Sequence, residues 1–166
     1  MPNEDGKEER PDRNYITANF SWVEAACKDG IDVPEKYQAD AGLVAVNMEK
    51  VRRFLGNTPI HVNSWYRTVS WNDRLYKEIR KKSPEAGKRS QHLTASAIDF
   101  WHDYWSPELI FITVDALMNS FFINQGGLGL YNNFVHYDVR GARTRWDKRT
   151  IGVNSVNETL IRRILR

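Results

Sequence analysis

The chain has 166 residues, of which 41% are hydrophobic and 27% are charged, and it carries a formal net charge of +3 at pH 7. This length allows one domain with a sizeable hydrophobic core. No run of about 18 apolar residues occurs, so a transmembrane helix is not expected. The single cysteine, Cys27, excludes an internal disulfide and fits a chain made in a reducing cytoplasm, although it does not indicate where the protein acts.

The two ends of the chain differ from its middle in composition. Residues 1–14 are polar and charged, without the apolar core or cleavage site of a secretory signal peptide, and predict a flexible N-terminal arm. Residues 15–166 are expected to form the domain. Its last part, residues 139–166, has eight Lys or Arg side chains against Asp147 and Glu158. Such a stretch favours an anionic partner (nucleic acid, anionic lipid or cell-wall polymer), or it forms internal ion pairs on a solvated face.

In the first half of the chain, helical and strand patterns alternate. Ser21, followed three residues later by Glu24, is a capping signature and predicts a short helix that ends near Gly30. Apolar residues spaced three and four apart predict a helix over residues 39–55. The next expected elements are a strand over residues 60–66 and a basic amphipathic helix over residues 70–82.

The second half of the chain continues this mixture. A short apolar run over residues 95–101 predicts a strand that carries Asp99. Ser106 and Pro107 predict the start of a helix that runs to about Phe121. The last expected elements are strands over residues 128–131 and 134–140, joined at Asn132 and Asn133, and a basic C-terminal helix over residues 155–165. We therefore predict a single α+β domain with helices packed on a small antiparallel sheet.

Two histidines and an aspartate form the most informative pattern in the chain. His92, Asp99 and His136 would make a three-ligand set that zinc accepts, with the fourth position left for water or substrate. If these side chains meet in space, the sequence indicates metal-assisted hydrolysis. The alternative is that both histidines are hydrogen-bonded without a metal. The set also suits other divalent first-row ions.

Asp138 and the two remaining histidines are the other polar candidates for this site. Asp138 lies two residues after His136, so the two side chains can face the same side of a strand. His61 and His102 are poorer ligand candidates, because the first begins a strand out of phase with Ser64 and the second lies in a surface turn.

Five motifs in fixed order carry a family resemblance. They are residues 63–68, 90–99, 126–131, 134–140 and 142–146, with Asn72 between the first two. Together they resemble the M15 family of zinc D-Ala-D-Ala carboxypeptidases and related peptidoglycan endopeptidases, particularly its small single-domain branch. The resemblance covers roughly residues 20–146.

The resemblance implies a role for each residue of the site. It implies one Zn²⁺ per chain, with His92, Asp99 and His136 as its ligands. It also implies that Arg67 binds a substrate carbonyl or carboxylate, since a planar guanidinium can hold a carboxylate bidentately and, as a catalytic group, stabilise an oxyanion. The alternative for Arg67 is a structural ion pair. Ser90 and Tyr131 are expected to bind substrate. Trp65, Tyr66 and Trp146 are candidates for the wall of a cleft, or equally for the core.

The chain departs from the family pattern at two positions. Ala95 stands where the family usually has glycine, a change that is tolerated if the backbone φ is negative. Asn133 stands where many relatives have an Asp or Glu general base, and an amide cannot accept the proton. Asp138 is the nearest carboxylate. It is expected either to replace the base or to fix the tautomer of a ligand histidine.

The function implied is zinc-dependent hydrolysis of peptide bonds in bacterial peptidoglycan stem peptides, by a D,D-carboxypeptidase or endopeptidase. The polar N-terminus suits a bacteriophage lysis enzyme that is made in the host cytoplasm and acts on the cell wall as a monomer. Asn133 supports an alternative, a non-catalytic zinc-bound module that binds wall peptides. A nucleic-acid-binding protein is not expected, since only the basic stretch supports it and no nucleic-acid motif is present.

Overall fold

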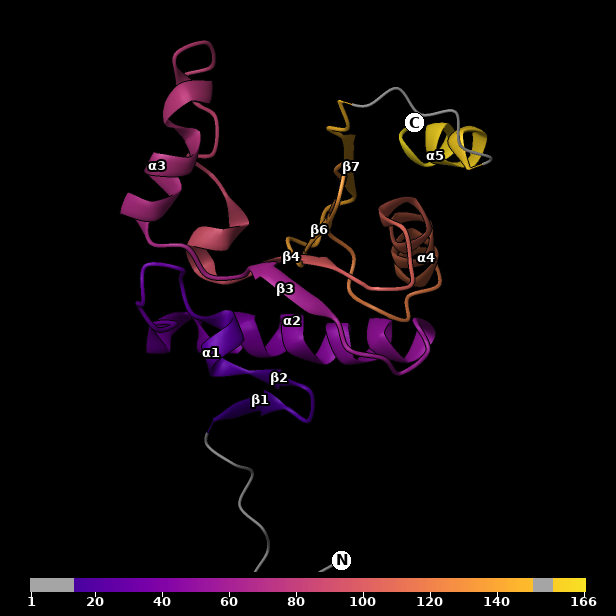
Figure 1. Cartoon of the computed structure of the whole chain (residues 1–166), viewed down its shortest axis with the longest axis horizontal. Coiled ribbons are helices and arrows are strands. Elements are labelled where there is room, and N and C mark those ends of the chain that lie inside the picture. The colour runs from indigo at the N-terminus through magenta and orange to yellow at the C-terminus, as the bar shows by residue number, and fades with distance from the viewer. Residues whose placement is uncertain (1–13, 151–156) are drawn as a thin grey trace, which may run out of the picture.

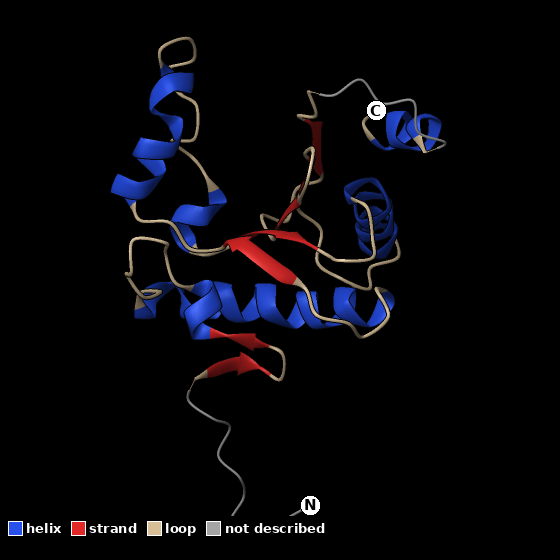
Figure 2. Ribbon diagram, viewed as in Figure 1, coloured by secondary structure: helices blue, strands red, loops and turns tan. Residues whose placement is uncertain are grey.

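The computed structural model describes residues 14–150 and 157–166. The predicted arm, residues 1–14, lies outside the described residues except for Asn14, as does the first part of the predicted C-terminal helix. In the described residues a five-stranded sheet is surrounded by helices, with a two-stranded hairpin at the N-terminal side (Figures 1 and 2). The α+β class predicted from the sequence is confirmed.

The N-terminal elements tie the chain to the long helix below the sheet. They are β1 (Tyr15–Thr17), β2 (Phe20–Ser21) and α1 (Trp22–Ala25). The predicted capping box is present, because Ser21 accepts from the backbone of Glu24 and the Glu24 side chain accepts from the backbone of Ser21. The helix ends at Ala25 rather than near Gly30, because Ala26 adopts an extended conformation and residues 27–31 close a separate turn.

Helix α2 (Glu35–Phe54) is the main support of the sheet. It begins four residues earlier than the apolar spacing predicts, because Pro34 precedes the first turn with a suitable φ. Its buried face includes Ala41, Val44, Met48 and Val51, and these side chains are part of one hydrophobic core with the sheet.

The central sheet places the strands in the order β3-β4-β6-β5-β7. Their bounds are β3 (His61–Ser64), β4 (Ala97–Trp101), β5 (Gly127–Leu130), β6 (Val135–Asp138) and β7 (Thr144–Asp147). The pairings β3–β4, β4–β6 and β5–β6 are antiparallel, as expected, whereas β5 and β7 pair in parallel. The sequence analysis did not predict β7, since this edge strand has no alternation of apolar and polar residues.

The remaining helices differ in how much of their surface is buried. They are α3 (Val69–Arg80), the 3-10 helix η1 (Gln91–Thr94), α4 (Pro107–Asn119) and α5 (Glu158–Ile164). Thr68 and Ser106 cap α3 and α4. Helix α4 packs on β5, whereas α3 projects beyond the sheet and buries only Asn72 (Figure 1). Among the described helices, none is both long and apolar enough to cross a membrane.

The basic stretch at the C-terminal end is largely paired internally. Arg145 contacts the buried carboxylate of Asp115 at 2.6 Å. Arg149 contacts carboxylates on three elements, including Asp147 at 2.5 Å and Glu158 at 3.2 Å. The second alternative from the sequence, internal ion pairs, therefore accounts for much of this positive charge.

Candidate metal centre

A single row of residues across the sheet forms the floor of the site. Strand register places Ser64, Asp99, His136, Gly129 and Trp146 side by side, one from each strand of the central sheet. On β4, β5 and β6, their neighbours along the strands point to the other face and belong to the core: Ile98, Phe100, Leu128, Leu130, Val135 and Tyr137. The row therefore collects polar side chains on the face of the sheet that the hydrophobic core leaves free.

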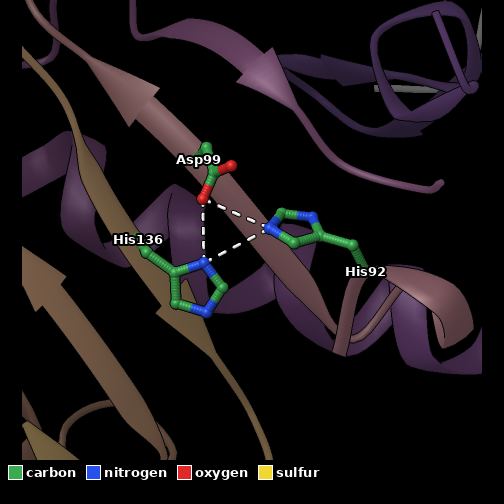
Figure 3. A group of neighbouring side chains, drawn as sticks. All are labelled: His92, Asp99 and His136. Atoms are coloured by element: carbon green, nitrogen blue, oxygen red, sulfur yellow. Dashed lines mark hydrogen bonds and ion pairs between the residues drawn. The ribbon is translucent and has the colours of Figure 1, made fainter. Parts of the chain in front are cut away.

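Three potential ligand atoms converge on this row. His92, from η1, points its Nε2 toward the Nδ1 of His136 and the Oδ1 of Asp99 (Figure 3). The separations are 3.3 Å between the two nitrogens, 3.2 Å from His92 to Asp99 and 2.8 Å from His136 to Asp99. Ligands of a tetrahedral zinc ion lie about 3.3 Å apart. The donor set therefore fits zinc after only a slight expansion of the triangle.

Each ligand is also held at its second polar atom. The Nδ1 of His92 lies 2.6 Å from the carbonyl oxygen of Trp65. The Oδ2 of Asp99 accepts from the guanidinium of Arg67, which also donates to Ser64. The Nε2 of His136 lies 3.0 Å from Asp138. These contacts leave one free donor atom on each ligand, the arrangement that orients metal ligands in proteins.

The electrostatics of the three ligands suit a cation. Burial lowers the pKa of His92, which favours its neutral, metal-binding form. Burial alone would raise the pKa of Asp99, but the neighbouring histidines hold it well below its usual range, so this carboxylate stays ionised. Burial would lower the pKa of His136, but hydrogen bonds to Asp138 and Asp99 raise it.

Asp138 is buried behind His136, on the side of the ring away from the other two ligands. It is fully buried, and Arg140 donates to both of its oxygens, at 2.8 and 2.6 Å. Burial would raise the pKa of Asp138, but His136 and Arg140 lower it strongly. Of the two roles expected for Asp138, this geometry favours the one that fixes the tautomer of His136, because its oxygens face donors and not the cleft.

Ala95 does not have the negative φ on which its tolerance was expected to depend. It ends η1 in the left-handed conformation, with a φ of 57°, where glycine is the least strained residue. Two hydrogen bonds stabilise this turn: the carbonyl oxygen of Ala95 accepts from the buried indole of Trp65, and the backbone N–H of Ala95 donates to the carbonyl oxygen of His92. The chain thus holds a strained residue three positions after the candidate ligand His92.

A cleft of about 1070 Å³ opens above the three ligands, and it brings together the expected substrate-binding residues. Arg67, Ser90 and Tyr131 all line it. Tyr131 stacks on Phe134 with ring centroids 4.3 Å apart, and its hydroxyl accepts from the indole of Trp146 at 3.1 Å. Arg67 forms the structural ion pair with Asp99 that was one of its two expected roles, and it also lines the cleft, so a role in substrate binding stays a prediction.

Of the other candidates, only Trp146 lies at the cleft. Trp65 and Tyr66 are buried in the core, whereas Trp146 lines the cleft. His61 pairs with Asp103, and His102 contacts Thr58, so neither histidine joins the ligand set. Asn133 is exposed in the turn before β6 and does not line the cleft.

Two glycines of β5 shape the site and were missed by the sequence analysis. A Cβ on Gly127 would lie 2.3 Å from a carboxylate oxygen of Asp138, and one on Gly129 would lie 2.3 Å from the indole nitrogen of Trp146. Both glycines therefore make room for side chains from neighbouring strands. The available signal was a Gly-x-Gly pattern inside a strand, which indicates a close approach of other groups.

Comparison with known proteins agrees with this site. A family model described as Peptidase M15 matches residues 14–138, which include all three candidate ligands. No curated protein matches the chain. The match spans most of the sequence and ends with Asp138, so it contains the whole metal centre together with Arg67. The chain therefore belongs to the Peptidase M15 family.

Proposed function

We propose that this peptidase hydrolyses peptide bonds in the stem peptides of bacterial peptidoglycan, with zinc, as a D,D-carboxypeptidase or endopeptidase. The observation that carries the proposal is the ligand triangle of His92, Asp99 and His136, each ligand anchored at its second polar atom, below an open cleft. A structural zinc site would be closed by a fourth protein ligand. In the described residues the metal-binding group has three members.

The residues around the ligands have separate tasks in this proposal. A zinc ion held there supplies a Lewis acid for the scissile carbonyl and lowers the pKa of a bound water. Arg67 keeps Asp99 oriented and presents positive charge to the cleft, where it can bind a substrate carbonyl or carboxylate. Ser90 and Tyr131 offer hydroxyl groups at the cleft surface for hydrogen bonds to peptide groups.

Few carboxylates are placed to accept a proton at the cleft. Asp138 is turned away from the cleft, and Asn133 is an amide. Among the described residues that line the cleft, Asp99 and Glu85 are the carboxylates. Since Asp99 belongs to the ligand set, Glu85 is the remaining side chain that can accept a proton there, and its partner is Lys88 at 2.7 Å.

This scarcity of carboxylates supports a second candidate function. A metal centre without a base would bind wall peptides in the same cleft and leave them intact. The two candidates share the zinc site and the ligand, and they differ only in turnover.

Incubation of purified peptidoglycan with the protein separates these candidates. We expect release of D-alanine or of new amino termini, which stops with a chelator and returns with added zinc. His136→Ala should lose both the metal and the activity. Release that persists in the chelator, or in His136→Ala, would overturn the proposal. Zinc bound at one per chain without release from several wall types would favour the binding module.

Bacteriophage lysis is the biological setting that we propose for this activity. Its support is the resemblance to the small single-domain branch of the family. Addition of the protein to bacteria with permeabilised membranes should lower their turbidity, and unchanged turbidity with every wall type that the protein cleaves in purified form would contradict this setting.

A further inference from the structure

The cleft has two walls that differ from its floor in charge. Helix α3 and the loop that follows it stand on one side of the site, and the end of β7 stands on the other (Figure 1). Arg89 lines the first wall, three residues before the ligand His92. Lys148 lines the second wall, where its backbone N–H donates to the carbonyl of Leu130 at 2.8 Å.

Most of the charges at the cleft are already neutralised by a partner. Arg67 pairs with Asp99. Arg140 pairs with Asp138 at 2.6 Å. Glu85, at the rim, pairs with Lys88. In these pairs the charges of the side chains balance one another.

Arg89 and Lys148 differ from these paired groups. Both side chains are exposed, and neither forms a hydrogen bond or ion pair with the part of the chain that the structure describes. Arg89 feels the negative charge of Glu85 only at longer range. The cleft therefore has one uncommitted positive charge on each wall, and a cleft lined in this way concentrates anionic ligands.

The neutral lining restricts the class of anion. Leu75 and Ile79 of α3 are about half exposed and present an apolar surface to the cleft, beside the hydroxyl group of Ser90. A chain of phosphates offers nothing to an apolar wall, whereas a peptide offers small apolar side chains, amide groups and carboxylates together. The lining thus favours an acidic peptide.

We propose that Arg89 and Lys148 determine substrate specificity by binding two carboxylates of an acidic peptide that lies across the metal centre, one carboxylate at each wall. This inference rests on the proposed function in that it names the chemistry of the ligand of the same cleft. It assigns recognition to two residues outside the ligand set and outside the motifs of the sequence analysis.

The test uses the full-length, zinc-loaded protein and one synthetic peptide in four forms. The peptide is L-alanyl-γ-D-glutamyl-L-lysyl-D-alanyl-D-alanine with a fluorescent label on its N-terminus. In the first form the glutamyl α-carboxylate and the terminal carboxylate are both free. In the second and third forms one or the other is amidated, and in the fourth form both are amidated. Fluorescence anisotropy gives the dissociation constant, and mass spectrometry of the same samples reports cleavage. Where the peptide is cleaved, kcat/KM replaces the dissociation constant.

At low salt we expect the dissociation constant of the doubly amidated peptide to be about tenfold higher than that of the free peptide, or its kcat/KM to be about tenfold lower. Each carboxylate should account for about threefold. Raising the salt to about 0.5 M should remove most of this preference, because the charges are exposed and screened. Arg89→Gln and Lys148→Gln should each lose the preference for a different carboxylate, and the double variant should lose both. The matched controls Arg163→Gln and Lys77→Gln remove exposed charges outside the cleft and should keep the full preference.

The outcomes separate this inference from the proposed hydrolysis. A preference below about twofold in the wild-type protein, or a preference that survives in the double variant, overturns the inference even if the peptide is cleaved. A preference that depends on both residues while none of the four peptides is cleaved supports the inference and counts against hydrolysis. Equal binding of inorganic polyphosphate and the free peptide would also overturn it, since the site would then recognise charge alone.

Discussion

Replacing Asp138 by Asn is the sharpest test of how the metal centre is held. Both oxygens of Asp138 face donors only: the Nε2 of His136 at 3.0 Å, the backbone N–H of Gly127 at 2.9 Å, and Arg140. An asparagine side chain has one acceptor oxygen and one NH₂ group. In either orientation, the NH₂ group meets a donor, and Arg140 loses its counter-charge.

The expected loss is in metal affinity and is moderate. Carboxylates that orient a ligand histidine contribute about 10- to 100-fold to metal affinity, which is about 1.4 to 2.7 kcal/mol. A buried donor left without an acceptor costs about 1 to 3 kcal/mol of folding stability as well. We therefore expect Asp138→Asn to fold, to melt at a lower temperature and to bind zinc 10- to 100-fold more weakly.

The chain contains a matched control for this change. Asp147 and Arg149 form the same two-residue pair as Asp138 and Arg140: the carboxylate accepts from the backbone N–H of Arg149 at 2.9 Å and from the Nε and Nη2 of its guanidinium. No ligand histidine contacts Asp147. Asp147→Asn should therefore lower the melting temperature in a similar way while leaving zinc affinity unchanged.

Competition with a chromophoric chelator measures the zinc affinity of each variant, and release of amino termini from peptidoglycan at saturating zinc measures turnover. Recovery of turnover in Asp138→Asn at saturating zinc would support the positioning role. Unchanged zinc affinity with turnover lost would refute our reasoning and identify Asp138 as the base. Equal losses of zinc affinity in Asp138→Asn and Asp147→Asn would attribute the effect to general destabilisation.

Three further changes test the local geometry. Ala95→Gly should stabilise the protein by about 1 kcal/mol, or roughly 3 °C in a thermal melt, because it removes the strain at positive φ; a lower melting temperature would contradict this. Gly129→Ala should lower the free energy of unfolding by about 1 to 3 kcal/mol, because the new methyl group displaces Trp146, and peptidoglycan hydrolysis should fall as well. Wild-type stability and activity in this variant would show that the indole can move freely. Burial would raise the pKa of Asp147, but its hydrogen bonds with Arg149 lower it, so this pair stabilises the fold above about pH 4 and less as the pH falls further. Denaturant titrations should therefore show a weaker dependence on pH below about 4 in Arg149→Met than in the wild type.

The features that were predicted best from the sequence are those that depend on residues close together in the chain. The capping box at Ser21 and the cap at Ser106 are local, and both are present. The candidate ligands His92, Asp99 and His136 come together as expected, from η1 and from the paired strands β4 and β6.

The sequence could not predict the contacts that cross the chain. The carbonyl of Trp65 that holds His92 lies 27 positions away, and Arg67 and Asp99 are 32 positions apart. The left-handed conformation of Ala95 was missed because alanine gives no signal for it. Strand β7 was missed because its pairing with β5, and not its own residues, makes it a strand.

Strand β5, which has no functional side chain at the site, determines much of the geometry of the site. In β5, Gly127 and Gly129 face the same side as the ligands, and neither presents a side chain there. The space above Gly127 admits the carboxylate of Asp138, and the space above Gly129 admits the indole of Trp146, whose ring centroid lies 5.1 Å from that of His136. His136 is thus held at its Nε2 edge and packed against the indole by groups that enter only because glycine leaves room. A search for chemically active residue types overlooks such positions, since they act through the absence of a side chain.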